Sequence, residues 1–505
     1  MALGTRESFA AALARVRRYA ADSPERRPAL GLRLPEIHRN RVMAIGRAPA
    51  LGRKDDGHLT IRSTVQRISD GALTSAELVE QALERIRERN RPLNAFTCVL
   101  EAEARRQAAA LDAEARAGAP RGPLHGIPVA VKDVIHVEGA PTTASSRVLD
   151  DSVATADAEA VRRLREAGAV FVGKTSTHEF ALGVTTPQSR NPWDPARIPG
   201  GSSGGSAIAV ATGMSLGALG TDTRASIRIP AALCGVVGMK PTFGLVSTWG
   251  VVTLSWSMDH VGPIAATVED VTVLLTTLVG HDPRDPGSVD RPAEDFGRYL
   301  GRRVAGLAVG VPAACLSDCD KEVLDAFERA EQLFRDLGVR MVAINEPGPD
   351  ELEAANAAGL IVSRAEAASF HRELFARRGS LYTRDVFEQL DEAHRVPAVD
   401  YLQAQRFRRE FMERMIRRLE PVDALAMPTA PLPAPRADES EAYLTTLSRN
   451  CVPWSFIGFP AISLPCGRTA QGLPIGLELV GAPFADGLVV AMASAFETVH
   501  GLLRT

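Results

Sequence analysis

The spacing of apolar residues predicts helices that alternate with strands over most of the chain. Residues 74–77 read Thr-Ser-Ala-Glu, a helix capping box, and Leu78, Ala82 and Ile86 follow on one helical face until 90–92, Asn-Arg-Pro, ends the helix. The same reasoning predicts a helix over 157–167, a strand over 169–172, a strand over 304–311, a helix over 323–337, a strand over 339–344 and a helix over 401–419. This alternation indicates an α/β fold with a largely buried sheet.

The predicted helix over 401–419 has an apolar face and a basic face. The apolar face carries Phe407, Phe411, Met415 and Ile416 at helical spacing. The basic residues are expected to point into solvent, and they are Arg406, Arg408, Arg409, Arg417 and Arg418.

Residues 1–57 form an N-terminal helical extension of a main domain that we expect to span 58–505. Phe9, Leu13 and Val16 give one apolar stripe on a short helix, and Arg- and Pro-rich sequence follows. Such a segment is typical of a piece that caps a domain or packs across a dimer, so a homodimer is one expected assembly.

Composition and charge exclude several classes of protein. The chain has 505 residues, of which 45% are hydrophobic and 24% charged, and a formal net charge of −3, so it is not disordered or fibrous, and neither nucleic acid nor an anionic membrane is an expected partner. Residues 1–18 lack the apolar segment of a secretory signal, and the uncharged stretch 198–221 is too rich in Gly and Ser to span a membrane. We therefore expect a soluble, cytoplasmic protein.

The cysteines point to neither disulfides nor zinc. Six cysteines in a chain of this length make no disulfide framework, and Cys315 and Cys319 lack a second pair of ligands. No metal ion or organic cofactor is expected.

Lysine is rare in this chain. Of the 58 basic residues only five are lysines, namely Lys54, Lys132, Lys174, Lys240 and Lys321. Since arginine supplies nearly all other positive charge, a retained lysine suggests a role that needs an amine able to lose its proton. Three of the five lie in or beside the apolar, Gly-rich middle of the chain. Chance and packing explain any single one equally well.

Two short motif matches fail on their context. Residues 168–175 match the P-loop pattern, but their four variable positions form a strand that follows a helix, whereas a phosphate-binding loop follows a strand. Residues 201–205 match the G-x-S-x-G nucleophile elbow, but turn-forming residues 191–199 stand where a strand is required. The sequence therefore favours neither a nucleotide-binding protein nor an α/β-hydrolase.

A third pattern spreads over residues 124–242. It consists of an apolar strand that ends in Lys132, a Gly- and Ser-rich segment at 199–206, and the segment 220–242. In this order the residues resemble the amidase signature family, the Ser-cisSer-Lys amidohydrolases. The resemblance extends from about residue 59 to 500 and includes 173–180, 257–263 and 458–476. It implies the amidase signature fold, a large mixed β-sheet core covered by helices on both faces.

Amide hydrolysis needs a nucleophile, a proton carrier for the leaving nitrogen and donors for the oxyanion. None of the ten histidines lies within the Gly-rich block. A buried lysine can carry the proton instead if its pKa falls from about 10.4 towards 7 to 8. The apolar neighbours of Lys132 on both sides suit such a shift.

The family resemblance assigns the catalytic roles. Ser226 resembles the nucleophile, Ser202 the bridging serine in a cis peptide, and Lys132 the base that later returns the proton to the leaving amine. The resemblance also implies an oxyanion hole formed by backbone N–H groups, and these belong to Thr223, Arg224, Ala225 and Ser226. Supporting roles fall to three residues, with Ser203 holding the lysine amine by a hydrogen bond and Asp222 and Arg228 bracing the nucleophile loop.

The chain departs from the commonest family pattern, in which two glycines precede the nucleophile. Arg224 and Ala225 stand there, so we expect a loop conformation open to any L-residue. The Arg224 cation is then expected to contact either a polar or carboxylate group of the substrate or a local Asp or Glu. Ser145, where the family often has Gly, and Glu478, where it often has Gln, have no interpretation from the sequence.

The residues and the resemblance together predict an amidase that hydrolyses a linear carboxamide, or a carbamate or acyl-urea relative, through an acyl-enzyme on Ser226. Two alternatives stay open: the glutamine-hydrolysing subunit of a tRNA-dependent amidotransferase, and a catalytically inactive binding protein of the same fold. The small-molecule amide is expected to contact the variable region 350–450. An apolar acyl site, or equally core, is predicted from Phe370, Phe375, Tyr382, Met427, Trp454 and Phe456.

Overall fold

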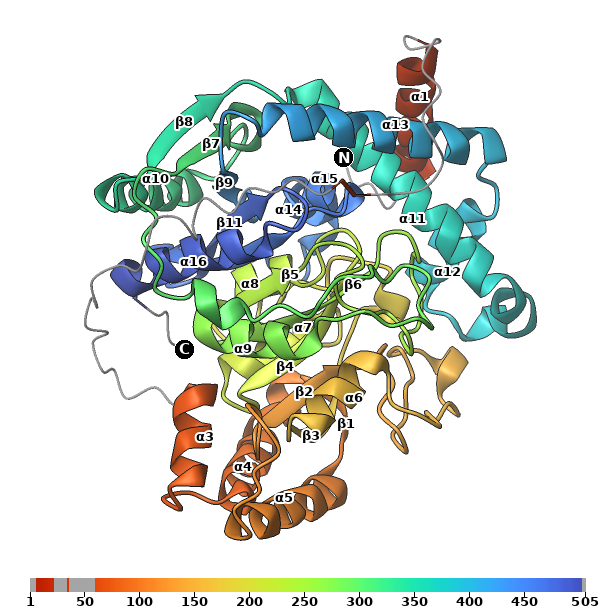
Figure 1. Cartoon of the computed structure of the whole chain (residues 1–505). Helices are drawn as coiled ribbons and strands as arrows, with labels where there is room; N and C mark the ends of the chain where they lie inside the picture. Colours follow the sequence, from red (N-terminus) through yellow and green to blue (C-terminus); the bar gives the residue numbers. More distant parts are fainter. Residues whose placement is uncertain (1–5, 22–33, 36–59, 502–505) are drawn as a thin grey trace.

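The computed structural model describes residues 6–21, 34–35 and 60–501. Its strands form one mixed 11-stranded sheet in the order β1-β3-β2-β4-β6-β5-β10-β11-β9-β7-β8 (Figure 1). The strands are β1 Phe96–Val99, β2 Pro128–Lys132, β3 Val170–Thr175, β4 Gly217–Asp222, β5 Val237–Lys240, β6 His260–Ala265, β7 Ala308–Pro312, β8 Arg340–Ile344, β9 Ala424–Pro428, β10 Ala461–Arg468 and β11 Pro474–Gly481.

Helices fill most of the sequence between these strands. They are α1 Arg6–Ala21, α3 Ile61–Ser69, α4 Ser75–Leu93, α5 Glu101–Arg116, α6 Glu159–Glu166, α7 Gly204–Ala211, α8 Arg228–Cys234, α9 Val268–Leu278, α10 Lys321–Asp336, α11 Pro349–Arg378, α12 Arg384–Ala393, α13 Ala398–Arg418, α14 Leu444–Ser448, α15 Val452–Phe456 and α16 Asp486–His500. Among the described residues, no helix is long and apolar enough to cross a membrane.

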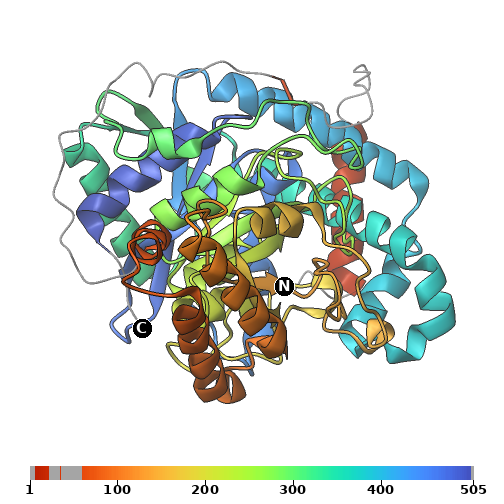
Figure 2. The same ribbon diagram turned by 60° about the horizontal axis from the view of Figure 1, so that its bottom comes forward.

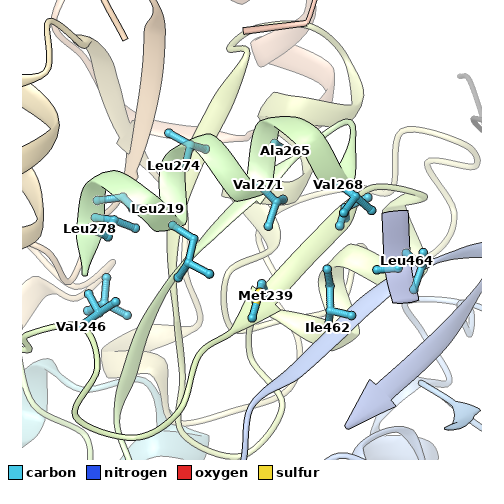
Figure 3. Close-up of a cluster of buried hydrophobic side chains, with 14 of the residues drawn as sticks. Leu219, Met239, Val246, Ala265, Val268, Val271, Leu274, Leu278, Ile462 and Leu464 are labelled. Carbon is cyan, nitrogen blue, oxygen red and sulfur yellow. The ribbon is translucent and has the colours of Figure 1, made fainter. Parts of the chain in front are cut away.

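The sheet is covered on both faces because successive strand residues point to opposite sides. In β2, Val129 and Val131 belong to the hydrophobic core that includes α9 and α16, whereas Ala130 belongs to the core formed with α4, α5, α7 and α8. Figure 3 shows the first of these cores, to which α9 contributes Leu274 and β4 contributes Leu219. The predicted α/β fold, with a large mixed sheet between helices, is confirmed.

The predicted elements agree with the structure apart from small shifts at their ends. The capping box is present, since Thr74 accepts from the N–H of Glu77 (3.1 Å) and the Glu77 carboxylate accepts from the N–H of Thr74 (2.8 Å). The helix runs past the predicted stop to Leu93, because Asn94 closes it in the left-handed conformation.

The other predicted elements are α6, β3, β7, α10, β8 and α13. Two boundaries differ for reasons of strand pairing. β3 continues to Thr175 because Lys174 and Thr175 still pair with β2, and β7 begins only at Ala308, where its pairing with β8 starts. The segment that matches the P-loop pattern therefore ends inside a buried strand, as the sequence context predicts.

The prediction that Arg408 of α13 points into solvent is wrong. Its side chain is 2% exposed and donates to the carbonyl oxygens of Ser257 (2.7 Å) and Phe456. These acceptors satisfy the guanidinium inside the core, which allows an arginine next to the apolar face of the helix to turn inward. Of the other arginines predicted to face solvent, Arg417 is exposed and the rest are partly exposed.

The N-terminal helix α1 packs on α11 and α13 (Figure 2). Ala12 and Val16 are buried there, Phe9 and Leu13 pack against the same core, and Arg17 binds Asp400 through two hydrogen bonds of 2.6 and 2.9 Å. This packing agrees with a segment that caps the domain. Apart from residues 34–35, the predicted Arg- and Pro-rich part of 1–57 lies outside the described residues, and the homodimer stays a prediction.

Candidate active site

Lys132, Ser202 and Thr221 meet where two neighbouring interior strands of the sheet end. β2 and β4 are parallel neighbours, so Lys132 at the end of β2 and Thr221 near the end of β4 lie side by side. The Nζ of Lys132 contacts the Oγ of Ser202 at 2.7 Å and the Oγ1 of Thr221 at 2.7 Å. The structure thus brings the predicted lysine and bridging serine together, inside the protein and away from solvent.

The environment of Lys132 changes its acidity. Burial lowers the pKa of Lys132 to about 7, and the carboxylates of Asp222 and Asp259 act in the opposite direction. An amine with this pKa is partly neutral near pH 7, and a neutral amine can accept a proton from a neighbouring hydroxyl.

The backbone before Ser202 approaches its neighbours closely. The Gly201–Ser202 peptide bond is cis, as the resemblance implies. A Cβ at Gly201 would lie 2.0 Å from the carbonyl oxygen of Thr185, so only glycine fits at this position. The carbonyl oxygen of Ser202 accepts from the N–H of His178 (3.3 Å) and the hydroxyl of Thr186 (3.3 Å). These contacts fix Ser202 beside Lys132.

Ser203 does not make the predicted hydrogen bond to the lysine amine. Its hydroxyl donates to the carbonyl oxygen of Thr221 (3.1 Å) and accepts from the N–H of Thr221 (3.3 Å), and its own N–H donates to the carbonyl oxygen of Ser226 (3.1 Å). Ser203 therefore joins the end of β4 to the nucleophile loop. The hydroxyl that reaches the amine belongs to Thr221, which the sequence analysis missed although it lies within the 220–242 segment.

Ser226 lies in the loop between β4 and α8 and is 5% exposed. Within the described residues, its hydroxyl has no hydrogen-bond partner, so the lysine end of the predicted proton relay is formed and the Ser226 end is open.

The loop from Thr223 to Ser226 presents free backbone donors. Within the part of the chain that the structure describes, the N–H groups of these four residues donate no hydrogen bond. None of the four has a positive φ, which agrees with the expected loop conformation open to Arg224 and Ala225. Unpaired N–H groups beside a serine are what an oxyanion hole requires.

The predicted bracing of this loop by Asp222 and Arg228 matches the geometry. Arg228 donates to Asp222 through Nε (3.0 Å) and Nη2 (3.1 Å), and Nη2 also donates to the carbonyl oxygen of Arg224 (3.1 Å). Burial alone would raise the pKa of Asp222, but the charge and hydrogen bonds of Arg228 hold that pKa below its usual range. The carboxylate therefore stays charged and the loop stays anchored.

Thr223 anchors the loop from the other side. Its hydroxyl donates to Asp259 (2.6 Å), which also accepts from the backbone N–H groups of Leu254 and Ser255. Burial raises the pKa of Asp259 to about 6, and these hydrogen bonds oppose the shift.

Comparison with known proteins identifies the family of this chain. A family model described as Amidase matches residues 77–490. The chain belongs to the amidase family. A protein named amidase from Pseudomonas putida is 41% identical over 450 residues, which cover 87% of this chain and 95% of the relative. A glutamyl-tRNA(Gln) amidotransferase subunit from Anaeromyxobacter sp. (strain K) is 39% identical over 88% of this chain and 97% of the relative.

A solved structure described as an amidase has a TM-score of 0.78 and 36% identity, and the match covers 88% of this chain and 100% of that structure. The predicted amidase signature fold is therefore confirmed, and this amidase is an amidohydrolase.

Both remaining departures from the family pattern have a structural context in this amidase. Ser145 has a φ of 51°, in the left-handed region that favours glycine, which explains why glycine is common there. Glu478 is fully buried, forms an ion pair with Arg228 and accepts from the thiol of Cys451 (3.1 Å). Glu478 thus extends the bracing network around the nucleophile loop.

Of the two alternatives for Trp454, an acyl site or the core, its position supports the core. Trp454 is fully buried in the hydrophobic core with Met427 and Phe456, and its Nε1–H donates to the Sδ of Met427 (3.3 Å). These three residues are core residues. Tyr382 is also buried, whereas Phe370 is exposed at the surface of α11.

The other central lysines have different partners. Lys174 forms an ion pair with Asp133 (3.1 Å), and Lys240 donates to the carbonyl oxygens of Phe459 and Pro241. Both are fully buried, so all three lysines of the central region lie inside the protein, and Lys132 is the one beside Ser202. Among the described residues, no group of three or more His, Cys, Asp or Glu side chains is placed to hold a metal ion.

Proposed function

We propose that this amidase hydrolyses the C–N bond of a linear carboxamide with Ser226 as nucleophile, Ser202 as proton relay and Lys132 as general base. The observation that carries the proposal is the 2.7 Å contact between the Lys132 amine and the Ser202 hydroxyl in a fully buried site. A buried amine with a pKa of about 7 can take up and return a proton at neutral pH.

The reaction follows from these positions. Ser202 passes its proton to Lys132 and receives the proton of Ser226, whose Oγ forms a bond to the substrate carbonyl carbon as the carbonyl electron pair moves to oxygen. The free N–H groups of residues 223–226 stabilise the resulting oxyanion. When the tetrahedral intermediate collapses, the C–N bond breaks and the proton returns through Ser202 to the leaving nitrogen. Water then cleaves the acyl-enzyme ester by the same route.

The open contact between Ser202 and Ser226 is compatible with this sequence, because catalytic hydrogen bonds often tighten only when substrate binds.

The test is ammonia or amine release over a panel of aliphatic, aromatic, amino-acid and carbamate amides. Ser226→Ala and Lys132→Ala are expected to lower kcat by at least about 10³-fold while the far-UV circular dichroism is unchanged. A fluorophosphonate or sulfonyl fluoride should label Ser226 in the native protein and not in Ser226→Ala. Near-normal turnover by either variant would overturn the assignment.

A second candidate is the activity of a subunit within a tRNA-dependent amidotransferase, which the 39% identity to such a subunit supports. That function predicts weak amide hydrolysis by the isolated chain and co-purification with partner subunits. Strong turnover by the chain alone favours the stand-alone amidase. The third alternative, an inactive binding protein, is disfavoured because the lysine, both serines and the free loop N–H groups are all retained.

A further inference from the structure

Within the described residues, the side chain of Arg224 forms no ion pair. Its carbonyl oxygen is held by Arg228 (3.1 Å) and by the hydroxyl of Ser455 (3.2 Å), so its backbone is fixed two residues before Ser226. Its Nε is buried and, within the described residues, has no hydrogen-bond partner. Burial lowers the pKa of Arg224 to about 10, with no carboxylate opposing the shift. The predicted alternative of a local Asp or Glu partner is therefore not supported by the described residues.

The charge of a second arginine, Arg364 of α11, is repelled by the charge of Arg224. It is 8% exposed, and it donates to the neutral side-chain amide of Gln389 on α12. Burial lowers the pKa of Arg364 to about 9, and repulsion by the Arg224 charge contributes to the shift, while Asp385 and Glu392 oppose it. Two guanidinium groups with little access to water thus repel each other.

Hydrogen bonds tie this part of α11 to the nucleophile loop. Glu366, two residues after Arg364, accepts from the hydroxyl of Ser255 (2.6 Å). The N–H of Ser255 donates to Asp259 (3.0 Å), which in turn accepts from the hydroxyl of Thr223. The two arginines therefore sit on elements that are fixed relative to each other and to Ser226.

The contrast with Arg228 shows what the pair lacks. Arg228 is fully buried and is neutralised by Asp222 and Glu478. Two arginines with little access to water that, within the described residues, form no ion pair cost free energy, and a bound anion would recover part of it. A carboxylate matches the planar fork of a guanidinium and accepts two hydrogen bonds from it.

We propose that Arg224 and Arg364 bind a carboxylate of the substrate, so that this amidase prefers linear amides that also carry a free carboxylate. This inference rests on the proposed function, because it places the carboxylate within reach of the amide that Ser226 attacks. A neutral analogue would leave both guanidinium groups desolvated and unpaired, which is the basis of strong discrimination.

The test compares monoamides of dicarboxylic acids with the corresponding diamides, with one to four methylene groups between the carbonyl carbons. Each pair differs only in a carboxylate replaced by a neutral amide of the same shape. For at least one spacer length, the wild-type kcat/KM for the monoamide should exceed that for the diamide by about tenfold or more. The ratio should fall by about tenfold in Arg224→Gln and in Arg364→Gln.

Arg384→Gln is the matched control, because it removes one positive charge from α12 at an exposed residue that pairs with Glu388. In this variant the ratio of kcat/KM for the monoamide to kcat/KM for the diamide should equal that of the wild type. If a Gln variant does not fold, Arg224→Lys and Arg364→Lys replace it. These variants keep the positive charge but lose the planar guanidinium, so the ratio of kcat/KM for monoamide to diamide should fall only in part. Inhibition of wild type by the free dicarboxylate, weakened in the variants, provides a readout independent of turnover.

The outcomes separate the two proposals. Equal kcat/KM for monoamide and diamide at every spacer length, or a preference that neither arginine variant reduces, overturns the carboxylate site and leaves the amidase proposal intact. Failure of wild type to cleave either series, together with no labelling of Ser226 by a fluorophosphonate, overturns the proposed function and the carboxylate site with it.

Discussion

The Nζ of Lys132 and the Oγ of Ser202 lie 2.7 Å apart at a depth where neither side chain is exposed. The distance allows a proton to pass between them, and the burial weakens the charged form of the amine. The two properties arise from one arrangement, in which β2 ends in the middle of the sheet next to β4. The same burial that lowers the pKa of the lysine also makes it a cost to folding, and both consequences are measurable.

The activity should depend on the protonation of Lys132. Since the base must be neutral to accept a proton and its pKa is about 7, kcat/KM should rise with pH and reach half its maximum near pH 7. A pH profile of ammonia release with a neutral amide measures this. If kcat/KM stayed constant down to pH 5, the Lys132 amine would not be the base.

The stability should also depend on this lysine. The pKa of Lys132 is lowered in the folded state, so between pH 7 and about 10 the unfolded chain binds one proton more. The free energy of unfolding of wild type should therefore rise with pH relative to Lys132→Met, by at most about 1.4 kcal/mol per pH unit. Denaturant unfolding of both proteins at pH 7, 8.5 and 10 tests this, and the buried Lys174 and Lys240 cancel because both proteins contain them. If the free energy of unfolding of the two proteins differed by the same amount at all three pH values, the prediction would be contradicted.

Patterns along the chain predicted the main elements and the lysine–serine pair, but contacts between distant segments were not readable. Thr221 was missed because its place beside Lys132 depends on the pairing of β2 with β4, which no spacing within either strand reveals. Ser203 was assigned the contact that Thr221 makes, since both hydroxyls lie near the end of β4. A resemblance identifies the residues near a site more readily than the bonds among them.

The error at Arg408 and the open alternatives at Trp454 have a similar cause. Arg408 occupies a position next to the apolar face of its helix, and the carbonyl groups that let it turn inward come from residues more than forty positions away. Trp454 lies in a short helix that is covered on both sides, which composition does not disclose. In both cases the partners, and not the residue itself, decide whether a side chain faces solvent, the site or the core.

Thr221 should act as a positioning residue for Lys132. Thr221→Val keeps the shape and removes the hydroxyl 2.7 Å from the amine, so kcat should fall by about tenfold, which is the order of one hydrogen bond. Because that hydroxyl accepts from the charged amine, its loss should also move the acid limb of the pH profile to lower pH. Thr221→Ser, which retains the hydroxyl, is the control and should keep the limb near pH 7. An unchanged limb in Thr221→Val would assign the residue a packing role only.

The ion-paired network around Arg228 should dominate the stability of the nucleophile loop. Arg228→Leu leaves Asp222 and Glu478 buried without their cation, and the expected loss is about 3 to 5 kcal/mol. Glu478→Gln keeps an acceptor of the same shape and is expected to change the free energy of unfolding by less than about 1 kcal/mol. Denaturant midpoints measure both. If Arg228→Leu lowered the free energy of unfolding by much less than this, the loop would be held by its backbone contacts alone.

Gly201 should tolerate no side chain. A Cβ at this position would lie 2.0 Å from the backbone carbonyl oxygen of Thr185, and a backbone atom cannot move away as the end of a flexible side chain can. Gly201→Ala should cost about 2 to 3 kcal/mol of stability and should also displace Ser202 from Lys132, so that residual activity falls below what the stability loss alone explains. Gly348→Ala is the control, since a Cβ at that position would have no atom within 4 Å and its φ is negative, and it should cost less than about 1 kcal/mol and leave kcat unchanged. Equal behaviour of the two variants would mean that the chain around Ser202 can shift without loss of the lysine contact, and that the close approach of Gly201 to Thr185 does not position the relay.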